Sequence, residues 1–146
     1  MSVTIQASQV IDRPLADVFR FHAREHVRNH PRWDPDIELW LDSSEPLAVG
    51  TLIRRRNIRS GTPVEGTMQV GEFEPERAFA VVIHDGPAEM RGRSTYEALT
   101  PGQTRLTTSV EIPGMDAAAD TSFIAGRLQL SLDHIKQLIE SEVAPV

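Results

Sequence analysis

Residues 11–35, IDRPLADVFRFHAREHVRNHPRWDP, decide the fold, because one strand ends and two short helices begin within this stretch. Asp12 can cap a helix and Pro14 suits a first helical turn, so the chain leaves its strand here. Side chains that recur every three or four residues then predict a short amphipathic helix: Leu15, Val18, Phe19 and His22. A second short helical segment around residues 26–27 should end at Pro31.

Strand-like segments surround this stretch. Before it, Val3, Ile5 and Ala7 alternate with polar residues, which is the two-residue period of a half-buried strand. After it, further strands are predicted at Ile37–Asp42, Thr51–Arg59, Val64–Phe73, Phe79–His84, Ala88–Leu99 and Thr104–Ile112. Because short turns separate these segments, the strands should pair as an antiparallel meander.

The hydrophobic period changes again from Asp116 to Glu142, a segment without proline. Apolar side chains recur there on one helical face: Ile124, Leu128, Leu132, Ile135 and Ile139. This pattern predicts one long amphipathic helix, whose apolar face must pack on a large partner. The concave face of the sheet is the partner that the chain offers, so sheet and helix should enclose the core.

Two further motifs are VGEFEPERAFAV at residues 70–81 and YEALTPGQTRLTTSVEI at residues 96–112. With the opening stretch and the element order, they cover essentially the whole chain, which resembles the START-like (SRPBCC, helix-grip) superfamily and its polyketide cyclase/dehydrase-like branch. The resemblance implies an α+β helix-grip fold. In this fold a curved seven-stranded antiparallel sheet wraps around a long carboxy-terminal helix, and two short helices follow the first strand. Members bind sterols, lipids, polyketides, plant hormones or quinones, and only some of them are enzymes.

The composition limits the classes of function. The chain has 146 residues, a net charge of −6 and no cysteine, so we expect one domain over residues 1–146 without disulfides or thiolate chemistry. The acidic charge and the lack of a basic run argue against nucleic-acid binding. No apolar run is long enough to span a membrane, and the amino terminus does not look like a signal peptide, which together predict a cytoplasmic protein.

No cofactor and no metal ion are expected. The sequence has no phosphate-binding glycine loop or dinucleotide fingerprint, and its one lysine, Lys136, should lie on the wet face of the long helix. His22, His26 and His30 stand four residues apart, a spacing that can chelate zinc on a continuous helix. Because the family breaks its helix near His22 and no fourth ligand is obvious, we interpret these histidines as a solvated or partly packed face.

Three consecutive arginines, Arg54, Arg55 and Arg56, cannot all face water, because successive side chains of a strand point to opposite faces. Either Arg55 points to the concave side with Asn57, or Arg54 and Arg56 do so, and we favour Arg55. An inward guanidinium could fix a carboxylate, a phenolate or an enolate. The alternative is an exposed position or an ion pair across the hairpin.

Tyr96 and His84 are candidates for proton transfer. Tyr96 should share the cavity-facing side of its strand with Met90 and Ser94, because charged residues occupy the other side. Its phenol could contact a ligand, donate a proton or simply pack against the long helix. His84 closes its strand, where it could act as a general base near neutral pH or lie on the surface.

The two tryptophans should have different roles. Trp33 occupies the tryptophan position of the family's RWDP-like junction, so we expect it to pack inward beneath the short helices at the cavity rim. Trp40 alternates with the apolar side of its strand, which indicates the outer face or a subunit contact such as that of a homodimer.

The leading functional hypothesis is a protein that binds a small hydrophobic ligand, aromatic, polyketide-like or lipid-like, in a cavity between sheet and helix. If it is an enzyme, we expect cofactor-independent cyclisation or dehydration, with Arg55, Tyr96 and His84 as the catalytic residues. The predicted ligand contacts are Trp33, Asn57, Met68, Met90, Ser94, Phe123 and Arg127. The alternatives are a non-catalytic lipid or quinone carrier or chaperone, and an interaction domain whose interior is filled by its own side chains.

Overall fold

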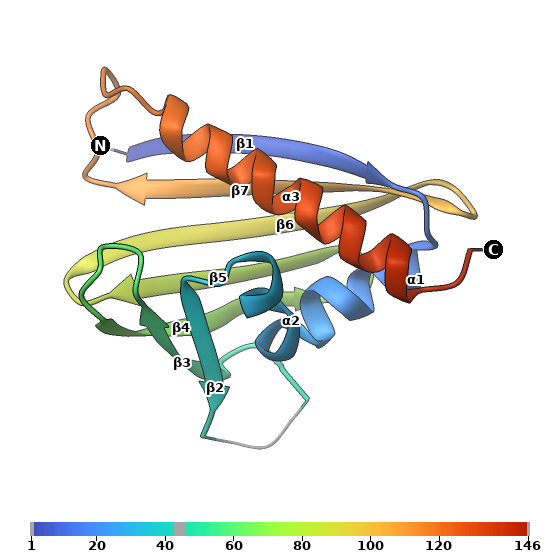
Figure 1. Cartoon of the computed structure of the whole chain (residues 1–146), viewed down its shortest axis with the longest axis horizontal. Helices are drawn as coiled ribbons and strands as arrows, with labels where there is room; N and C mark the ends of the chain where they lie inside the picture. Colours follow the sequence, from blue (N-terminus) through green and yellow to red (C-terminus); the bar gives the residue numbers. More distant parts are fainter. Residues whose placement is uncertain (1, 43–45, 146) are drawn as a thin grey trace.

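The computed structural model describes residues 2–42 and 46–145, and its elements follow the predicted order (Figure 1). Strand β1 (Ser2–Ile11) is followed by short helical segments: α1 (Leu15–Phe19), η1 (Arg20–Arg24) and α2 (His26–Trp33). The remaining strands are β2 (Ile37–Leu41), β3 (Leu52–Asn57), β4 (Val64–Glu74), β5 (Ala78–Asp85), β6 (Ala88–Thr100) and β7 (Gln103–Pro113). The long helix α3 (Ser122–Glu142) comes last.

The strands form one antiparallel, seven-stranded sheet in the order β1-β7-β6-β5-β4-β3-β2, which confirms the predicted fold class. The pairing register shifts between Val70 and Glu72 in β4 and between Ala98 and Thr100 in β6. Bulges of this kind bend a strand and increase its twist. The sheet therefore curves, and α3 runs across its concave side with the short helices at one end (Figure 1).

The core lies between the concave face of the sheet and α3. Strand side chains that point inward are buried, among them Ile53, Met68, Val70, Phe79, Val81, Ile83, Tyr96 and Leu106. From α3 the buried residues are Leu132, Ile135 and Ile139. Burial of apolar surface stabilises such a core by roughly 25 cal/mol per Å², so the two periodic patterns of the sequence together account for this packing.

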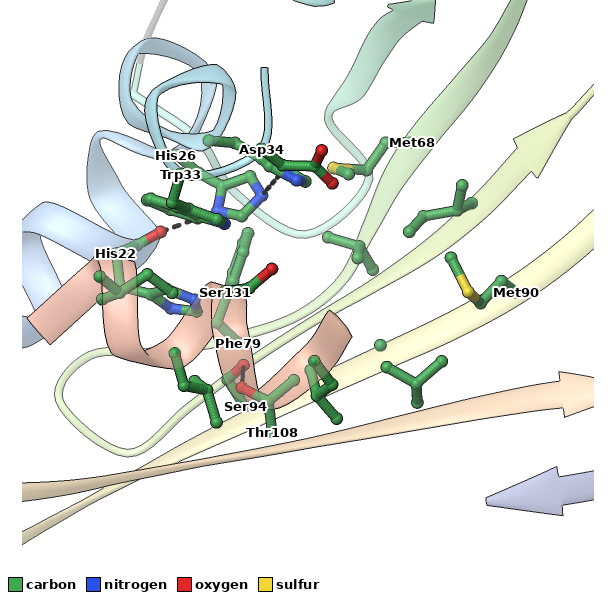
Figure 2. A pocket seen from close by; sticks show the side chains of 18 of the residues that line it. His22, His26, Trp33, Asp34, Met68, Phe79, Met90, Ser94, Thr108 and Ser131 are labelled. Atoms are coloured by element: carbon green, nitrogen blue, oxygen red, sulfur yellow. Dashed lines mark hydrogen bonds between the residues drawn. The ribbon is translucent and has the colours of Figure 1, made fainter. Parts of the chain in front are cut away.

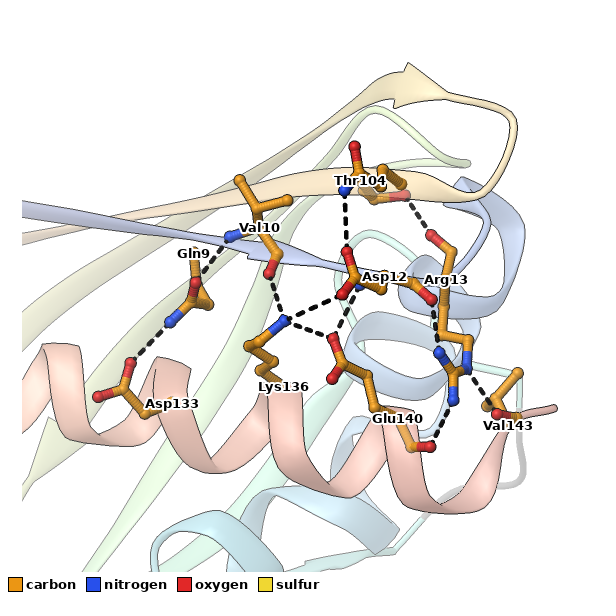
Figure 3. Close-up of polar contacts among 10 residues, drawn as sticks. Gln9, Val10, Asp12, Arg13, Thr104, Asp133, Lys136, Glu140 and Val143 are labelled. Atoms are coloured by element: carbon orange, nitrogen blue, oxygen red, sulfur yellow. Dashed lines mark hydrogen bonds and ion pairs between the residues drawn. The ribbon is translucent and has the colours of Figure 1, made fainter. Parts of the chain in front are cut away.

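Polar contacts fix the second half of α3 to β1 (Figure 3). Gln9 Nε2 donates to Asp133 at 2.8 Å, and Lys136 Nζ donates to the Val10 carbonyl at 2.9 Å. Arg13 donates to two backbone carbonyls near the end of the helix, those of Glu140 and Val143. Neither α3 nor any other helix within the described ranges has the length and hydrophobicity that a membrane crossing needs.

Two helix boundaries differ from the prediction. Helix α3 begins at Ser122 rather than Asp116, because the preceding residues form turns in which carboxylates accept backbone N–H groups, as Asp120 does from Ser122. Helix α2 continues through Pro31 instead of ending there. Pro31 removes only one intrahelical donor, and the Asp34 N–H still closes the last turn by donating to a backbone carbonyl, that of His30.

Candidate functional site

A cavity of about 170 Å³ lies between the concave face of the sheet and α3 (Figure 2). Most of its wall is apolar: Met68, Phe79, Val81, Ile83, Met90, Val110, Leu128, Leu132 and Ile135. The hydroxyls of Ser94 and Thr108 are 2.8 Å apart in this wall and satisfy each other. A cavity of roughly 150 Å³ lined by aliphatic and aromatic side chains can hold one benzene ring, so this cavity is large enough for a single ring.

Gly92 leaves the apolar part of the cavity open. A Cβ added at Gly92 would come no closer than 3.7 Å to its nearest neighbour, Val81 Cγ2, which is ordinary van der Waals contact. Larger side chains at this position would therefore extend into the cavity without a backbone clash.

Charged groups and imidazoles line the other end of the cavity: His22, His26, His30, Asp34, Arg55 and Arg59. These residues come from η1, α2, the α2–β2 junction, β3 and the segment after β3. Figure 2 shows His26, Asp34 and Trp33 together on one side of the cavity, with Met90 apart from them. The cavity thus has an apolar part and a polar end.

Arg55 is the buried cation of the polar end. It points to the concave side, as favoured from the sequence, and is only 3% exposed, whereas Arg54 and Arg56 lie over Trp40 on the outer face. Its Nε lies 2.7 Å from Asp85 Oδ1 and its Nη2 lies 3.2 Å from Asp85 Oδ2. Two neighbouring N–H groups of the guanidinium therefore donate to one carboxylate, a strong and directional geometry.

Asp85 remains a carboxylate in this setting. Burial raises its pKa, but the hydrogen bonds from Arg55 and from Asn57 outweigh burial, and the pKa falls below its ordinary value. Asn57 thus acts on Asp85 and does not line the cavity, which corrects its predicted role as a ligand contact.

Gly66 makes room for this ion pair. It lies opposite Arg55 in the β3–β4 register and opposite Asp85 in the β4–β5 register, between the two partners. A Cβ on Gly66 would lie 1.8 Å from the His84 carbonyl oxygen, which no side chain could tolerate. Glycine at this position allows β4 and β5 to approach closely. Because Gly66 has no side chain, the Arg55 side chain can cross over β4 and reach Asp85 on β5.

Two buried polar atoms at the polar end have no hydrogen-bond partner among the described residues: Arg55 Nη1 and Asp34 Oδ1. Asp85 occupies only the Nε and Nη2 side of the guanidinium. Asp34 accepts from Arg59 through its other oxygen at 2.6 Å, while Arg127 Nη2 stays 3.9 Å from Oδ1. An unmet buried polar group costs about 1–3 kcal/mol, so the residues of the polar end hold one donor and one acceptor whose bonding capacity is unused.

Three histidines and Trp33 form the helical wall of the polar end. His26 Nδ1 lies 2.8 Å from the His22 carbonyl, and His30 Nδ1 lies 2.9 Å from His26 Nε2. The Trp33 ring stacks on those of His22 and His30, with centroid distances of 5.4 and 5.3 Å. Because His22 and His26 are buried against the sheet, the expected solvated or partly packed face is wrong for these two residues.

The histidines of this wall are neutral at pH 7. Burial is the main cause that lowers the pKa of His22, of His26 (to about 4) and of His30, and the repulsion among them adds to it at His22 and His30. A carbonyl only accepts hydrogen bonds, so neutral His26 carries its proton on Nδ1 and accepts at Nε2. His30 therefore donates from Nδ1 and keeps a lone pair on Nε2.

Tyr96 faces the concave side as predicted, but it lies beneath His22 and is not part of the cavity wall. Its hydroxyl is 2.6 Å from His22 Nδ1, and Phe19 packs edge-on against its ring at 5.0 Å. Burial raises the pKa of the phenol, which stays protonated. Since the described residues offer the phenol no other acceptor, it donates to Nδ1 and places the His22 proton on Nε2.

An ion-pair cluster lies at the rim of the polar end. Besides its bond to Asp34, Arg59 places Nε 3.5 Å from Asp36 Oδ2, and Arg127 Nη2 is 3.6 Å from the same oxygen. Arg127 lies over the Phe123 ring, which is 72% exposed. Neither Arg127 nor Phe123 lines the cavity. Both lie in the first turns of α3 at its rim, so their role as ligand contacts stays a prediction.

The other predicted residues divide between cavity and surface. Trp33, Met68, Met90 and Ser94 line the cavity together with Arg55. His84 does not: it is 48% exposed on the outer face, 3.3 Å from Glu89. Strand alternation turns its neighbour Ile83 inward, so of the two alternatives for His84 the structure has the surface position.

The sequence analysis placed Arg55 and Ser94 on the cavity side but missed the other polar residues of the wall, among them His22, His26, His30, Asp34 and Arg59. The four-residue spacing of the histidines was the available signal, but the short π-helical turn η1, which contains His22, depends on packing. Over residues 2–42 and 46–145, no group of three or more His, Cys, Asp or Glu side chains is arranged to hold a metal ion.

The chain is similar to known proteins along almost its whole length. A family model described as polyketide cyclase/dehydrase and lipid transport matches residues 2–140. No curated protein matches the chain in sequence. The fold is similar to that of the Zhui aromatase/cyclase from a Streptomyces species, with a TM-score of 0.77, 14% identity and coverage of 99% of this chain and 97% of that one.

Two further solved structures share the fold. Ara h 8.0201 gives a TM-score of 0.76 at 14% identity, covering 97% of this chain and 100% of its own. A protein from Chromobacterium violaceum gives a TM-score of 0.72 at 18% identity, covering 94% of this chain and 97% of its own. At these identities the likeness concerns the fold alone.

Proposed function

The chain belongs to the polyketide cyclase/dehydrase and lipid transport family, and on this premise we propose that it binds a small, ring-sized hydrophobic ligand between its sheet and α3. The observation that carries this proposal is the apolar cavity of about 170 Å³, left open over Gly92. Its volume weighs against a long-chain lipid as cargo and favours a single ring.

The energy of such binding follows from buried area. An aromatic ring of phenylalanine size buries roughly 150–250 Å², which at about 25 cal/mol per Å² gives about 5 kcal/mol. The loss of translational and rotational freedom offsets part of this gain. A ring without polar groups should therefore bind weakly, and polar contacts should tighten it.

Titration of a single-ring hydrocarbon, toluene, by heteronuclear NMR tests the proposal. The variant Gly92→Leu puts an isobutyl group into the cavity and should weaken binding by at least about tenfold, which corresponds to about 1.4 kcal/mol. The matched control is Gly71→Leu, since Gly71 is exposed on the outer face and an added Cβ has no neighbour within 4 Å. Equal binding by parent and Gly92→Leu would contradict the proposed site.

Catalysis of a cyclisation or dehydration is the second candidate function, and the polar end of the cavity favours it. In the dehydration of a β-hydroxy ketone, a base takes the proton next to the carbonyl and an enolate forms. The enolate then expels the hydroxyl, which receives a proton from the protonated base and leaves as water. Arg55 Nη1 could stabilise the enolate oxygen. His22 and His30 are wall residues whose imidazoles could transfer protons, and Tyr96 would act by positioning His22.

Turnover of a single-ring β-hydroxy ketone, followed by the absorbance of the enone product, distinguishes an enzyme from a carrier. For an enzyme, Arg55→Lys should lower kcat by about 100-fold, the cost typical of a lost oxyanion donor. Tyr96→Phe should lower kcat more than it raises KM, because the phenol orients His22 and does not touch the substrate. Tight binding without turnover would favour the carrier.

A further inference from the structure

We propose that the ligand of this cavity is an uncharged single-ring molecule that carries a hydrogen-bond donor and an acceptor on one substituent, such as an aromatic amide or a hydroxy-carbonyl compound. The inference rests on the proposed function and deepens it, because it assigns the polar half of the ligand. It is carried by the unpartnered Arg55 Nη1 and Asp34 Oδ1, two buried atoms of residues that line the same cavity.

Both side chains are held in place by a neighbouring charged residue. Arg55 is fixed by Asp85 through Nε and Nη2, and Asp34 is fixed by Arg59 through Oδ2. They do not bond to each other, so the gap between them is wider than a hydrogen bond. A ligand group that accepts from Arg55 and donates to Asp34 would bridge that gap and satisfy both atoms.

The charges around the polar end are already balanced. The ion pairs join three guanidinium groups, those of Arg55, Arg59 and Arg127, to three carboxylates, those of Asp85, Asp34 and Asp36. The wall histidines add no charge in their neutral form. An anionic ligand would leave one negative charge uncompensated in a region of low dielectric, which is costly.

An anion would also meet Asp34 directly. A carboxylate could accept from Arg55 Nη1, but it has no proton to give to Asp34 Oδ1 and would repel it. A purely apolar ring would leave both buried atoms unmet. An uncharged donor–acceptor group avoids both penalties, and the rest of the molecule then fills the apolar part of the cavity.

Four ligands of nearly equal shape test the inference: benzamide, acetophenone, benzoate and ethylbenzene, titrated by isothermal calorimetry at pH 7. Benzamide has donor and acceptor, acetophenone only the acceptor, benzoate a negative charge, and ethylbenzene no polar group. We expect benzamide to bind about tenfold tighter than acetophenone, the worth of one buried hydrogen bond. Benzoate should bind more weakly than benzamide by at least the same factor.

Asp34→Asn provides the decisive variant. It removes one negative charge and replaces the orphaned acceptor by an amide, so the ratio of benzamide to benzoate affinity should fall by at least about tenfold. Asp36→Asn is the matched control, since it removes the same charge at the rim while Asp34 Oδ1 stays in place, and its ratio should stay closer to that of the parent. A role of Asp34 in folding alone would weaken all four ligands together.

The outcomes separate this inference from the proposed function. Tighter binding of benzoate than of benzamide by the parent would overturn the inference and identify an anion site. Equal binding of ethylbenzene and benzamide would overturn it as well, because the two orphaned atoms would then not contribute. If none of the four ligands binds, the proposed function itself fails.

Discussion

Among single residues, Arg55 has the largest influence on the polar end, because it is a buried cation with one partner carboxylate. Replacing Asp85 by alanine would leave this guanidinium buried and unpaired. Since breaking one side of a buried pair typically costs 3–5 kcal/mol and Asp85 is 18% exposed, we expect Asp85→Ala to lower the free energy of unfolding by about 3 kcal/mol. Denaturant unfolding at pH 7 measures this change.

The control for this prediction is the pair of Arg93 and Glu72 on the outer face, whose Nε and Oε1 are 2.8 Å apart, close to the 2.7 Å between Arg55 Nε and Asp85 Oδ1. Glu72→Ala should cost less than about 1 kcal/mol, as is usual for exposed pairs. A similar loss of unfolding free energy in Asp85→Ala and Glu72→Ala would mean that the burial of Arg55 does not determine the size of the loss.

The histidine wall makes stability depend on pH. The pKa of His26 is lowered from 6.5 in the unfolded chain to about 4 in the folded one, so the unfolded chain takes up a proton first as the pH falls. Stability should therefore be constant above pH 6.5 and decline between pH 6.5 and about 4, by roughly 3 kcal/mol from His26 alone.

Urea unfolding at several pH values tests this window. His26→Gln should flatten the decline, because the residue at position 26 then no longer titrates. A decline that is just as steep in His26→Gln would exclude His26 as its source.

At the level of elements, α3 has two unequal halves. Its buried residues, Leu132, Ile135 and Ile139, and its two short hydrogen bonds to β1, from Gln9 to Asp133 and from Lys136 to Val10, lie in the second half. In the first half Phe123 and Leu130 are exposed, and Gln129 reaches the Ser8 carbonyl only at 3.4 Å. Amides before residue 130 should exchange hydrogen faster than those after residue 132, because fewer contacts must break to open them. Hydrogen exchange read by NMR checks this, and uniform protection along α3 would contradict it.

The contact between β4 and β5 depends on Gly66. A methyl group there would collide with the His84 carbonyl and push β4 away from β5, the strand that carries Asp85. Gly66→Ala should lower the free energy of unfolding by about 2 kcal/mol or more, as overpacking does, and Gly71→Ala, with open space around its added Cβ, should have little effect. Thermal unfolding of the two variants measures the difference in stability, and an equal loss in both would contradict the role of Gly66.

The sequence patterns predicted the elements better than the site. Strand alternation correctly turned Met90 and Ser94 toward the cavity, because a two-residue period is fixed by the backbone. Alternation alone could not tell that Tyr96, on the same face, is covered by His22. That cover depends on the π-helical turn η1, whose extra residue no hydrophobic period reveals.

For the whole molecule, the curved sheet and α3 explain why a cavity remains at all. A sheet with bulges in β4 and β6 bends around one helix, and a single helix cannot fill the concave side completely. The family resemblance and the periodic patterns predicted this architecture. The volume of the cavity and its balanced charges depend on how individual side chains pack, which the patterns do not contain.

If a ring-sized ligand occupies the interior between the sheet and α3, bound benzamide should lie close to the methyl groups of the cavity wall. Nuclear Overhauser contacts between bound benzamide and the methyl groups of the protein measure this. We expect contacts to Val81, Val110 and Leu132 of the cavity wall, and their loss in Gly92→Leu. Contacts confined to exposed methyl groups, such as those of Val49 and Leu52, would contradict it.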